Sequence, residues 1–214
     1  MRAAYDYGAD AVYAGSPRYS LRARNNEFAK LDVLEQGIKE AHERNKKFFL
    51  TVNTLPHNSK LKTFVADMEP LIAMKPDALI MADPGLIMTV REKWPEMPIH
   101  LSVQANTTNY WGVKFWQNIG VERIILSREL SMEEIAEIRQ ECPDIELEVF
   151  IHGALCIAYS GRCLLSGYFN HRDPNQGTCT NSCRWDYKVH NATESDAGDA
   201  QLLQGFNFEK AQEE

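Results

Sequence analysis

The chain has 214 residues, of which 44% are hydrophobic and 25% charged, and its formal net charge is −7. This is the composition of an ordinary water-soluble protein, and no run approaches the roughly 20 apolar residues of a transmembrane helix or the apolar core of a signal peptide. We therefore expect a cytoplasmic protein without a membrane partner. The residues from Asn191 onward carry six acids and one lysine, so the remaining chain is nearly neutral and neither supports nor excludes a nucleic-acid partner.

Short apolar runs alternate with longer amphipathic segments from residue 11 to residue 152. The runs predict strands over Ala11–Ala14, Lys47–Asn53, Ala78–Ala82, Ile99–Gln104, Arg123–Ser127 and Leu147–His152. The segments predict helices over Leu31–Arg44, Leu61–Met74, Pro84–Trp94, Asn109–Asn118 and Ser131–Glu141. Strands that alternate with helices and read as buried on both faces are typical of a parallel sheet. These units predict an incomplete TIM-barrel-like (β/α)8 fold over residues 1–153.

Polar residues stand at the carboxyl ends of the predicted strands, where the active sites of (β/α)8 barrels form. The candidate catalytic residues, six near strand ends and two in the loop after the first strand, are Asn53, Asp83, Gln104, Arg128, Glu129, His152, Arg22 and Arg24. Each could instead cap a helix or bond to loop backbone, and Asp83, which precedes Pro84 and Gly85, is the clearest such case. The three arginines could pair with carboxylates of a small substrate, because guanidinium groups bind carboxylates in a bidentate manner.

Four of the five cysteines lie within 28 residues of one another, in a Gly-, Ser- and Asn-rich segment after the last predicted strand. They form two close pairs, Cys156 with Cys163 and Cys179 with Cys183, which a flexible loop could bring around one metal centre. Four thiolates beside polar loops suit an iron–sulfur cluster. Structural zinc fits the number equally well, although zinc pairs are usually closer than Cys156 and Cys163. Buried cysteines without a ligand are the remaining alternative, and we assign Cys142, at a helix end, to it.

The same segment carries basic and aromatic side chains that could contact phosphates and stack on bases. The candidate RNA-binding residues are Arg162, Tyr168, Arg172, Arg184 and Trp185. A solvated loop is the alternative. A proteolytic centre is not evident, because an extended chain would separate His152 from Cys156 by about 13 Å. The chain also has no G-x-S-x-G and no H-E-x-x-H motif.

The motifs of the chain resemble those of peptidase family U32, the collagenase-like peptidases of unknown catalytic type. The run EVFIHGALCIAYSGRCLLS matches the family signature E-x-F-x-x-G-A-x-C-x-x-x-x-G-x-C-x-x-S. The resemblance extends to about Lys188 through GADAVYAG, YSLRARNNEF, DALIMADPGLI, HLSVQAN, ILSREL and RDPNQGTCTNSCRW. Within the family, the chain resembles most the members that take part in tRNA hydroxylation.

This resemblance implies a tRNA-modifying enzyme for prephenate-dependent formation of 5-hydroxyuridine at the wobble uridine. It implies contact with the tRNA anticodon loop, prephenate as a co-substrate, and a redox or assembly partner protein. It also implies a [4Fe–4S] cluster on Cys156, Cys163, Cys179 and Cys183. A collagenase-like peptidase and a non-catalytic zinc-binding scaffold are the alternatives.

The resemblance also implies how the chain is divided. Relatives begin one strand earlier and continue beyond Lys188, so we expect a fragment. We divide it into a barrel portion over residues 1–153, a cysteine-rich region over residues 154–190 and a disordered acidic tail over residues 191–214.

Overall fold

The computed structural model describes residues 1–23, 26–153 and 155–187. The chain divides into two compact units, Met1–Cys183 and Arg184–Glu214. The predicted boundaries near residues 153 and 190 remain predictions, and the predicted acidic tail lies outside the described residues. In chain order the elements are α1 (Arg2–Asp6), β1 (Ala11–Gly15), α2 (Leu31–Glu43), β2 (Lys47–Val52), α3 (Asn58–Ala73), β3 (Ala78–Met81), α4 (Pro84–Lys93), β4 (Ile99–Leu101), η2 (Val103–Ala105), α5 (Tyr110–Asn118), β5 (Arg123–Ile125), α6 (Met132–Glu141), β6 (Glu146–Glu148), α7 (Leu165–Asn170), η3 (Pro174–Gln176) and η4 (Ser182–Arg184).

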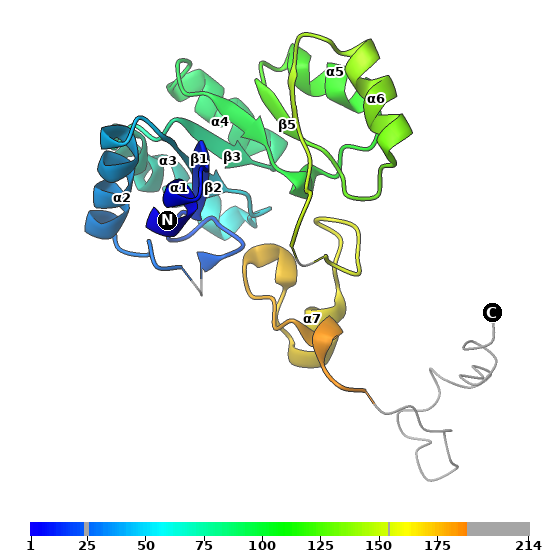
Figure 1. Cartoon of the computed structure of the whole chain (residues 1–214). Coiled ribbons are helices and arrows are strands. Elements are labelled where there is room, and N and C mark those ends of the chain that lie inside the picture. The colour runs from blue at the N-terminus through cyan, green and yellow to red at the C-terminus, as the bar shows by residue number, and fades with distance from the viewer. Residues whose placement is uncertain (24–25, 154, 188–214) are drawn as a thin grey trace, which may run out of the picture. The chain divides into compact units, whose positions relative to one another are not determined.

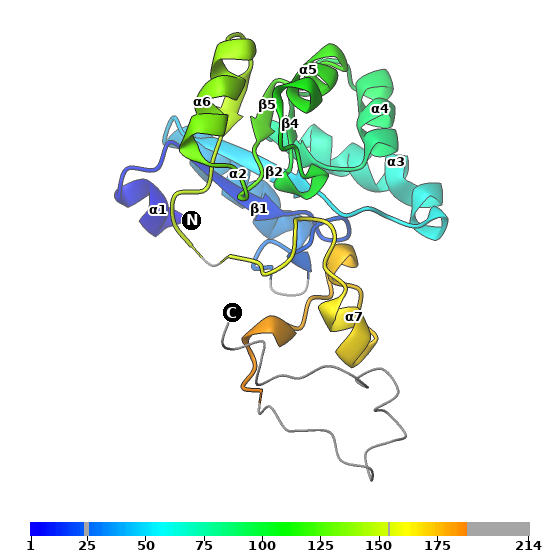
Figure 2. The same cartoon turned by 90° about the vertical axis from the view of Figure 1, so that its right-hand side faces the viewer.

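Six parallel strands form one sheet, and each strand is hydrogen bonded to the next strand along the chain. The register places Ala11 beside Lys47 at the β1 edge and Ile125 beside Glu148 at the β6 edge. The sheet curls into a half-barrel with helices between its strands (Figure 1), and Figure 2 shows the same arrangement from the side. The predicted partial TIM-barrel-like fold is therefore confirmed.

The two faces of the sheet have different packing. Alternate strand residues such as Phe48, Leu50 and Leu79 point toward the helices, where they form the larger core with helix residues such as Ile38 and Met68. This is the expected result of a two-residue repeat in the strands combined with apolar stripes on the helices. The opposite, inner face carries a smaller apolar cluster of Phe49, Ala78, Ile80, Val103 and Ile125.

Local sequence signals set the helix starts after three of the strands. Ser131 and Glu134 form the predicted capping box at the start of α6. Asn109 accepts a hydrogen bond from the Gly112 N–H at the start of α5. Asp83 accepts one from the Leu86 N–H at 2.9 Å and is followed by Pro84 at the first helical position. Each cap fixes the residue at which the helix after its strand begins.

Five of the six predicted strands run past the observed strand end, and two of them do so by three residues or more. The strand predicted over Ile99–Gln104 ends at Leu101 and continues as the 3-10 turn η2. The strand predicted over Leu147–His152 ends at Glu148, the last residue of β6. Its neighbour β5 ends at Ile125, and the last described backbone bond between the two runs from the Leu126 N–H to the Glu148 carbonyl. The prediction that the strands are buried on both faces is wrong for the two edge strands, since Tyr13 of β1 is 58% exposed and Glu146 of β6 is also exposed.

Candidate active site at the carboxyl ends of the strands

Asn53, at the end of β2, connects neighbouring strand ends. Its Nδ2 donates to Ser102 Oγ at 3.2 Å, and its Oδ1 accepts from the Leu21 N–H at 3.2 Å. Ser102 Oγ in turn accepts from the Gln104 N–H at 3.3 Å. The structure thus brings the predicted site residues Asn53 and Gln104 together through Ser102, a buried hydroxyl that the sequence analysis did not single out.

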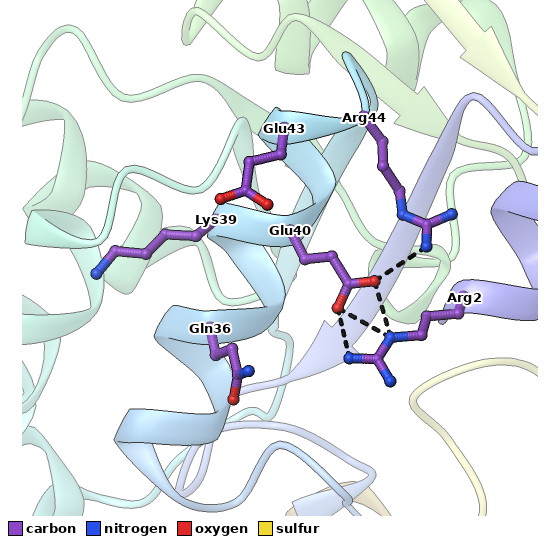
Figure 3. A pocket seen from close by; sticks show the side chains of 6 residues that line it. All are labelled: Arg2, Gln36, Lys39, Glu40, Glu43 and Arg44. Carbon is purple, nitrogen blue, oxygen red and sulfur yellow. Dashed lines mark hydrogen bonds and ion pairs between the residues drawn. The ribbon is translucent and has the colours of Figure 1, made fainter.

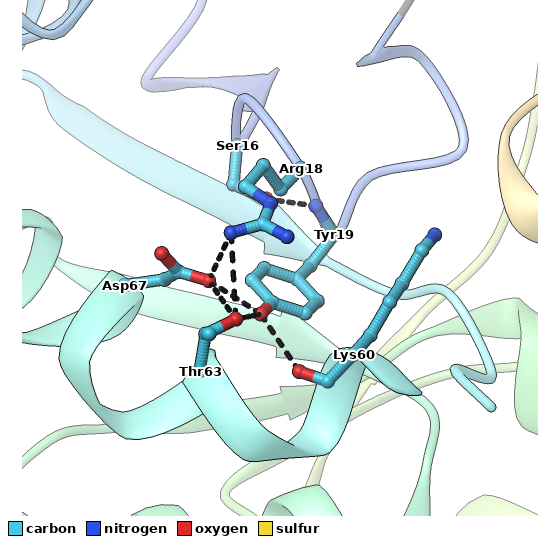
Figure 4. Close-up of polar contacts among 6 residues, drawn as sticks. All are labelled: Ser16, Arg18, Tyr19, Lys60, Thr63 and Asp67. Carbon is cyan, nitrogen blue, oxygen red and sulfur yellow. Dashed lines mark hydrogen bonds and ion pairs between the residues drawn. The ribbon is translucent and has the colours of Figure 1, made fainter. Parts of the chain in front are cut away.

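The loop after β1 is fixed on both sides. On the sheet side, Ser20 Oγ lies 2.9 Å from Thr51 Oγ1 and accepts from the Arg22 N–H at 3.1 Å. On the helix side, the hydroxyl of the buried Tyr19 donates to Asp67 Oδ2 at 2.7 Å (Figure 4). These bonds hold the backbone from Tyr19 to the Arg22 N–H, and the Arg22 side chain that follows is exposed.

The network around Tyr19 gathers several partners at one carboxylate. Asp67 Oδ2 also accepts from Thr63 Oγ1 at 2.8 Å and from Arg18 Nη1 at 2.8 Å, as Figure 4 shows. These hydrogen bonds lower the pKa of Asp67 even though burial opposes the shift. Burial raises the pKa of the Tyr19 hydroxyl, so that hydroxyl remains a neutral donor. The network anchors the loop that carries Arg22 to helix α3.

A second polar group follows β5. Ser127 Oγ lies 3.0 Å from Asn106 Oδ1 and is also bonded to a carboxylate oxygen of Glu129. Asn106 holds this position with a left-handed backbone, at φ 52°, a conformation that asparagine adopts more readily than most residues. Arg128 donates to the buried Ser160 Oγ at 2.6 Å. Two more predicted site residues, Arg128 and Glu129, therefore lie at this strand end.

The remaining predicted catalytic residues have other surroundings. Asp83 is occupied as the cap of α4, which is the structural role that the sequence analysis allowed for it. His152 is exposed, in the segment after β6. Arg24 lies outside the described residues. The assignment of catalytic roles to these three residues remains a prediction.

The cysteine-rich segment after β6 is held together by side-chain hydrogen bonds. The buried Ser166 accepts from the Thr180 N–H at 3.1 Å, and its hydroxyl lies 3.9 Å from the sulfur of Cys179. The Asn181 N–H also points at that sulfur, at 3.4 Å. Asn175 Nδ2 donates to the Cys163 carbonyl at 2.9 Å. The residues around the two predicted pairs therefore contact one another, although they are far apart in sequence.

The five cysteines form no disulfide, and they differ in how far each is exposed. Cys156, Cys179 and Cys183 are exposed, Cys163 is half-buried, and Cys142 is buried in the core as predicted. Within the described ranges, no three His, Cys, Asp or Glu side chains are grouped so as to hold a metal ion. The chemistry of the donors suits an iron–sulfur cluster, because they are free thiols and Cys179 already receives hydrogen bonds at sulfur. The positions of the thiols do not form a coordination shell.

The predicted RNA-binding residues lie on the surface of the same segment. Arg162, Arg172, Arg184 and Trp185 are exposed, and the Tyr168 ring on α7 is 72% exposed. The neighbouring Phe169 ring packs against Tyr168 with centroids 5.2 Å apart. An exposed aromatic pair flanked by arginines has the chemistry to stack on unpaired bases and contact phosphates, but contact with RNA remains a prediction.

Two hollows lie away from the strand-end residues. An open one of about 510 Å³ lies beside α2, where Glu40 accepts from Arg2 at 2.8 Å and pairs with Arg44 at 3.2 Å (Figure 3). These ion pairs satisfy the charges and tie α1 to α2. The other, of about 350 Å³, lies at the amino ends of the strands, where His100 and Arg123 line it. Neither hollow contains a predicted site residue.

The described part of the chain contains no helix that is both long and apolar enough to cross a membrane.

The fold and the polar strand ends define the class of protein as a partial (β/α) barrel with its candidate site at the carboxyl ends of the strands. The chain belongs to peptidase family U32, whose family model matches residues 1–212. It is 68% identical over 198 residues to tRNA hydroxylation protein P of Haemophilus influenzae and 67% identical to the protein of that name from Escherichia coli, and each match covers 92% of this chain. The chain spans 43% and 44% of the length of these relatives.

A solved structure supports the same fold. The U32 peptidase Mk0906 matches with a TM-score of 0.56 over 66% of this chain and 60% of that chain, at 14% identity. At that identity the match shows a shared fold and nothing of function.

Proposed function

We propose that this chain acts in tRNA hydroxylation, in the prephenate-dependent formation of 5-hydroxyuridine at the wobble uridine. The observation that carries the proposal is the 68% identity over 198 residues to a protein named for tRNA hydroxylation. The strand-end residues support it, since a fixed loop presents Arg22 and the end of β5 presents Arg128 and Glu129. Barrel enzymes carry out their chemistry at this end of the strands.

Different residues of the chain would bind the two substrates. Arg22 and Arg128 would bind the carboxylates of prephenate, because guanidinium groups match carboxylates in geometry and charge. Tyr168, Arg162 and Arg172 would hold the splayed anticodon loop by stacking and phosphate contact.

The cysteines would supply the remaining chemistry. Cys156, Cys163, Cys179 and Cys183 would hold a [4Fe–4S] cluster, which when bound would supply one-electron transfer. The hydrogen bonds that Cys179 receives from Asn181 and Ser166 would hold its sulfur in position as a ligand. A redox or assembly partner protein would load or reduce the cluster. A chain that binds zinc in place of iron would fit the scaffold alternative.

The peptidase alternative has less support from the described residues. Ser127 is bonded to Asn106 and Glu129, and Ser160 to Arg128. Neither of these buried serines is bonded to a histidine, so neither has the base that a serine nucleophile needs.

A genetic complementation experiment tests the proposal. The native gene of this protein would be deleted, and wobble 5-hydroxyuridine would be quantified in digested tRNA by mass spectrometry. We expect the modification to disappear and to return with the wild-type gene but not with the Arg128→Gln gene. The Tyr7→Phe gene is the matched control, since the Tyr7 ring is 95% exposed and lies away from the site. Unchanged tRNA in the deletion strain would overturn the proposal.

A further inference from the structure

Two glycines of the cysteine-rich segment lie against the backbone of the barrel. A Cβ atom at Gly177 would lie 2.7 Å from the Ser20 carbonyl oxygen and 3.6 Å from Leu21 Cα. A Cβ atom at Gly161 would lie 2.5 Å from the Gln104 carbonyl oxygen. Real Cβ atoms do not approach this closely, and a backbone oxygen cannot move aside as a flexible side chain can. Only glycine fits at either contact.

Both glycines also have backbone angles that other residues avoid. Gly161 has φ 75° and Gly177 has φ 84°. Glycine adopts this left-handed region at no steric cost, whereas a residue with a Cβ atom is strained there. The conformation and the close approach therefore require glycine independently at each position.

Each contact is reinforced by the residue just before the glycine. Gln176 donates through Nε2 to the Leu55 carbonyl, and its Oε1 lies 3.5 Å from Lys60 Nζ. Ser160 accepts from Arg128 Nη2 at 2.6 Å. The segment is thus attached to the barrel at two places, one at the loops after β1 and β2 and one at the ends of β4 and β5.

The two attachment points share a sequence pattern. Gly161 and Cys163 form one G-x-C unit, and Gly177 and Cys179 form another. The units are joined to each other, since Asn175 donates to the Cys163 carbonyl and Ser166 lies beside both Thr180 and Cys179. In each unit a cysteine comes two residues after a glycine that touches the barrel backbone.

We propose that Gly161 and Gly177 are positioning residues, and that through them the paired G-x-C units attach the cysteine-rich segment to the carboxyl ends of the strands. This fixes Cys163 and Cys179 relative to Arg22 and Arg128. The relevance of this attachment to catalysis rests on the proposed function, in which the cysteines and the strand-end arginines serve one reaction. The attachment itself is a property of the chain alone.

Hydrogen–deuterium exchange of the full chain tests this attachment, and the measurement needs no cofactor. We expect Gly177→Ala to speed exchange about tenfold in the peptides that cover residues 18–22 and 173–183, and Gly161→Ala to do so around residues 102–107 and 159–166. Gly167→Ala is the matched control, since Gly167 lies within α7 of the same segment and its Cβ would meet no atom within 4 Å. The control should leave exchange in all these peptides unchanged.

Further measurements distinguish a local loss of this attachment from a general destabilisation of the chain. Peptides of β2 and β3 should keep their protection in both glycine variants, and Gln176→Ala should act on residues 173–183 in the same direction as Gly177→Ala, more weakly. Unchanged exchange in Gly161→Ala and Gly177→Ala, or an equal loss of protection throughout the barrel, would overturn the proposal. Absence of tRNA hydroxylation in the wild type would count against the proposed function and leave these exchange results as they are.

Discussion

The imidazole of His100 on β4 lies edge-on to the ring of Phe49 on β2, with ring centroids 4.6 Å apart and planes at 73°. The strand between them presents the small Ala78 beside Phe49, which leaves room for the contact. The guanidinium of Arg123 lies 5.3 Å from the Phe49 centroid. His100 is buried, and its Nδ1 has no hydrogen-bond partner among the residues that the structure describes. A proton on this imidazole would therefore be poorly solvated and close to a cation.

This arrangement predicts a loss of stability in mild acid. Burial, followed by the nearby Arg123 cation, lowers the pKa of His100 from 6.5 to about 4, although Glu146 opposes the shift. The unfolded chain takes up this proton near pH 6.5, whereas the folded chain does so only near pH 4, so the unfolded state binds more protons in between. Stability from this group is complete above pH 6.5 and falls as the pH drops toward 4, by about 3 kcal/mol in total.

Urea unfolding at a series of pH values measures this effect. The free energy of unfolding of the wild type should fall more steeply between these pH values than that of His100→Gln, which has no group to titrate there. The carboxylates other than Glu146, which interacts with His100, act on both proteins alike, so the difference between the two curves reports on the histidine and its interaction with Glu146. Parallel curves for the two proteins would show that His100 is not the group responsible.

The sequence predicted the fold better than it predicted the site. Strand and helix periodicity, together with caps such as Ser131 and Asp83, depends on local chemistry that a single sequence records. The Ser102 bridge between strand ends depends on two strands lying side by side, which periodicity does not reveal. The end of β6 was misjudged for a similar reason, because apolar residues after Glu148 continue the strand pattern but have no neighbouring strand to pair with. The G-x-C repeat was visible in the sequence, and its meaning became clear only from the carbonyl oxygens that face Gly161 and Gly177.

Removal of the Tyr19 hydroxyl should loosen the loop that carries Arg22. Tyr19→Phe deletes the 2.7 Å hydrogen bond to Asp67 while the ring stays in the core against Phe64. We expect a loss of about 1–2 kcal/mol in the free energy of unfolding, the usual cost of breaking a partly buried hydrogen bond to a charged group. Chemical denaturation beside the Tyr7→Phe control, whose ring is almost fully exposed, measures the loss. Equal stability of the two variants would mean that the network does not anchor the loop.

Substitution of Asp83 should separate a capping role from a catalytic one. Asparagine caps helices about as well as aspartate, so Asp83→Asn should retain stability, whereas Asp83→Ala should lose about 1 kcal/mol because the Leu86 N–H loses its acceptor. If Asp83 is only a cap, Asp83→Asn should also restore wobble 5-hydroxyuridine fully in the deletion strain. Loss of the modification with unchanged stability would instead assign the carboxylate to the chemistry.

Replacement of single cysteines should identify the metal ligands. In anaerobically reconstituted protein, serine in place of Cys156, Cys163, Cys179 or Cys183 should lower the bound iron and the broad absorbance at about 400 nm that iron–sulfur clusters give. Cys142→Ser is the control: burial raises the pKa of the Cys142 thiol, which packs in the core and is not available as a thiolate ligand. That variant should lose stability and keep its iron. Stoichiometric zinc without colour in the wild type would favour the scaffold alternative, because zinc has no redox chemistry and could not supply the electron transfer that we propose.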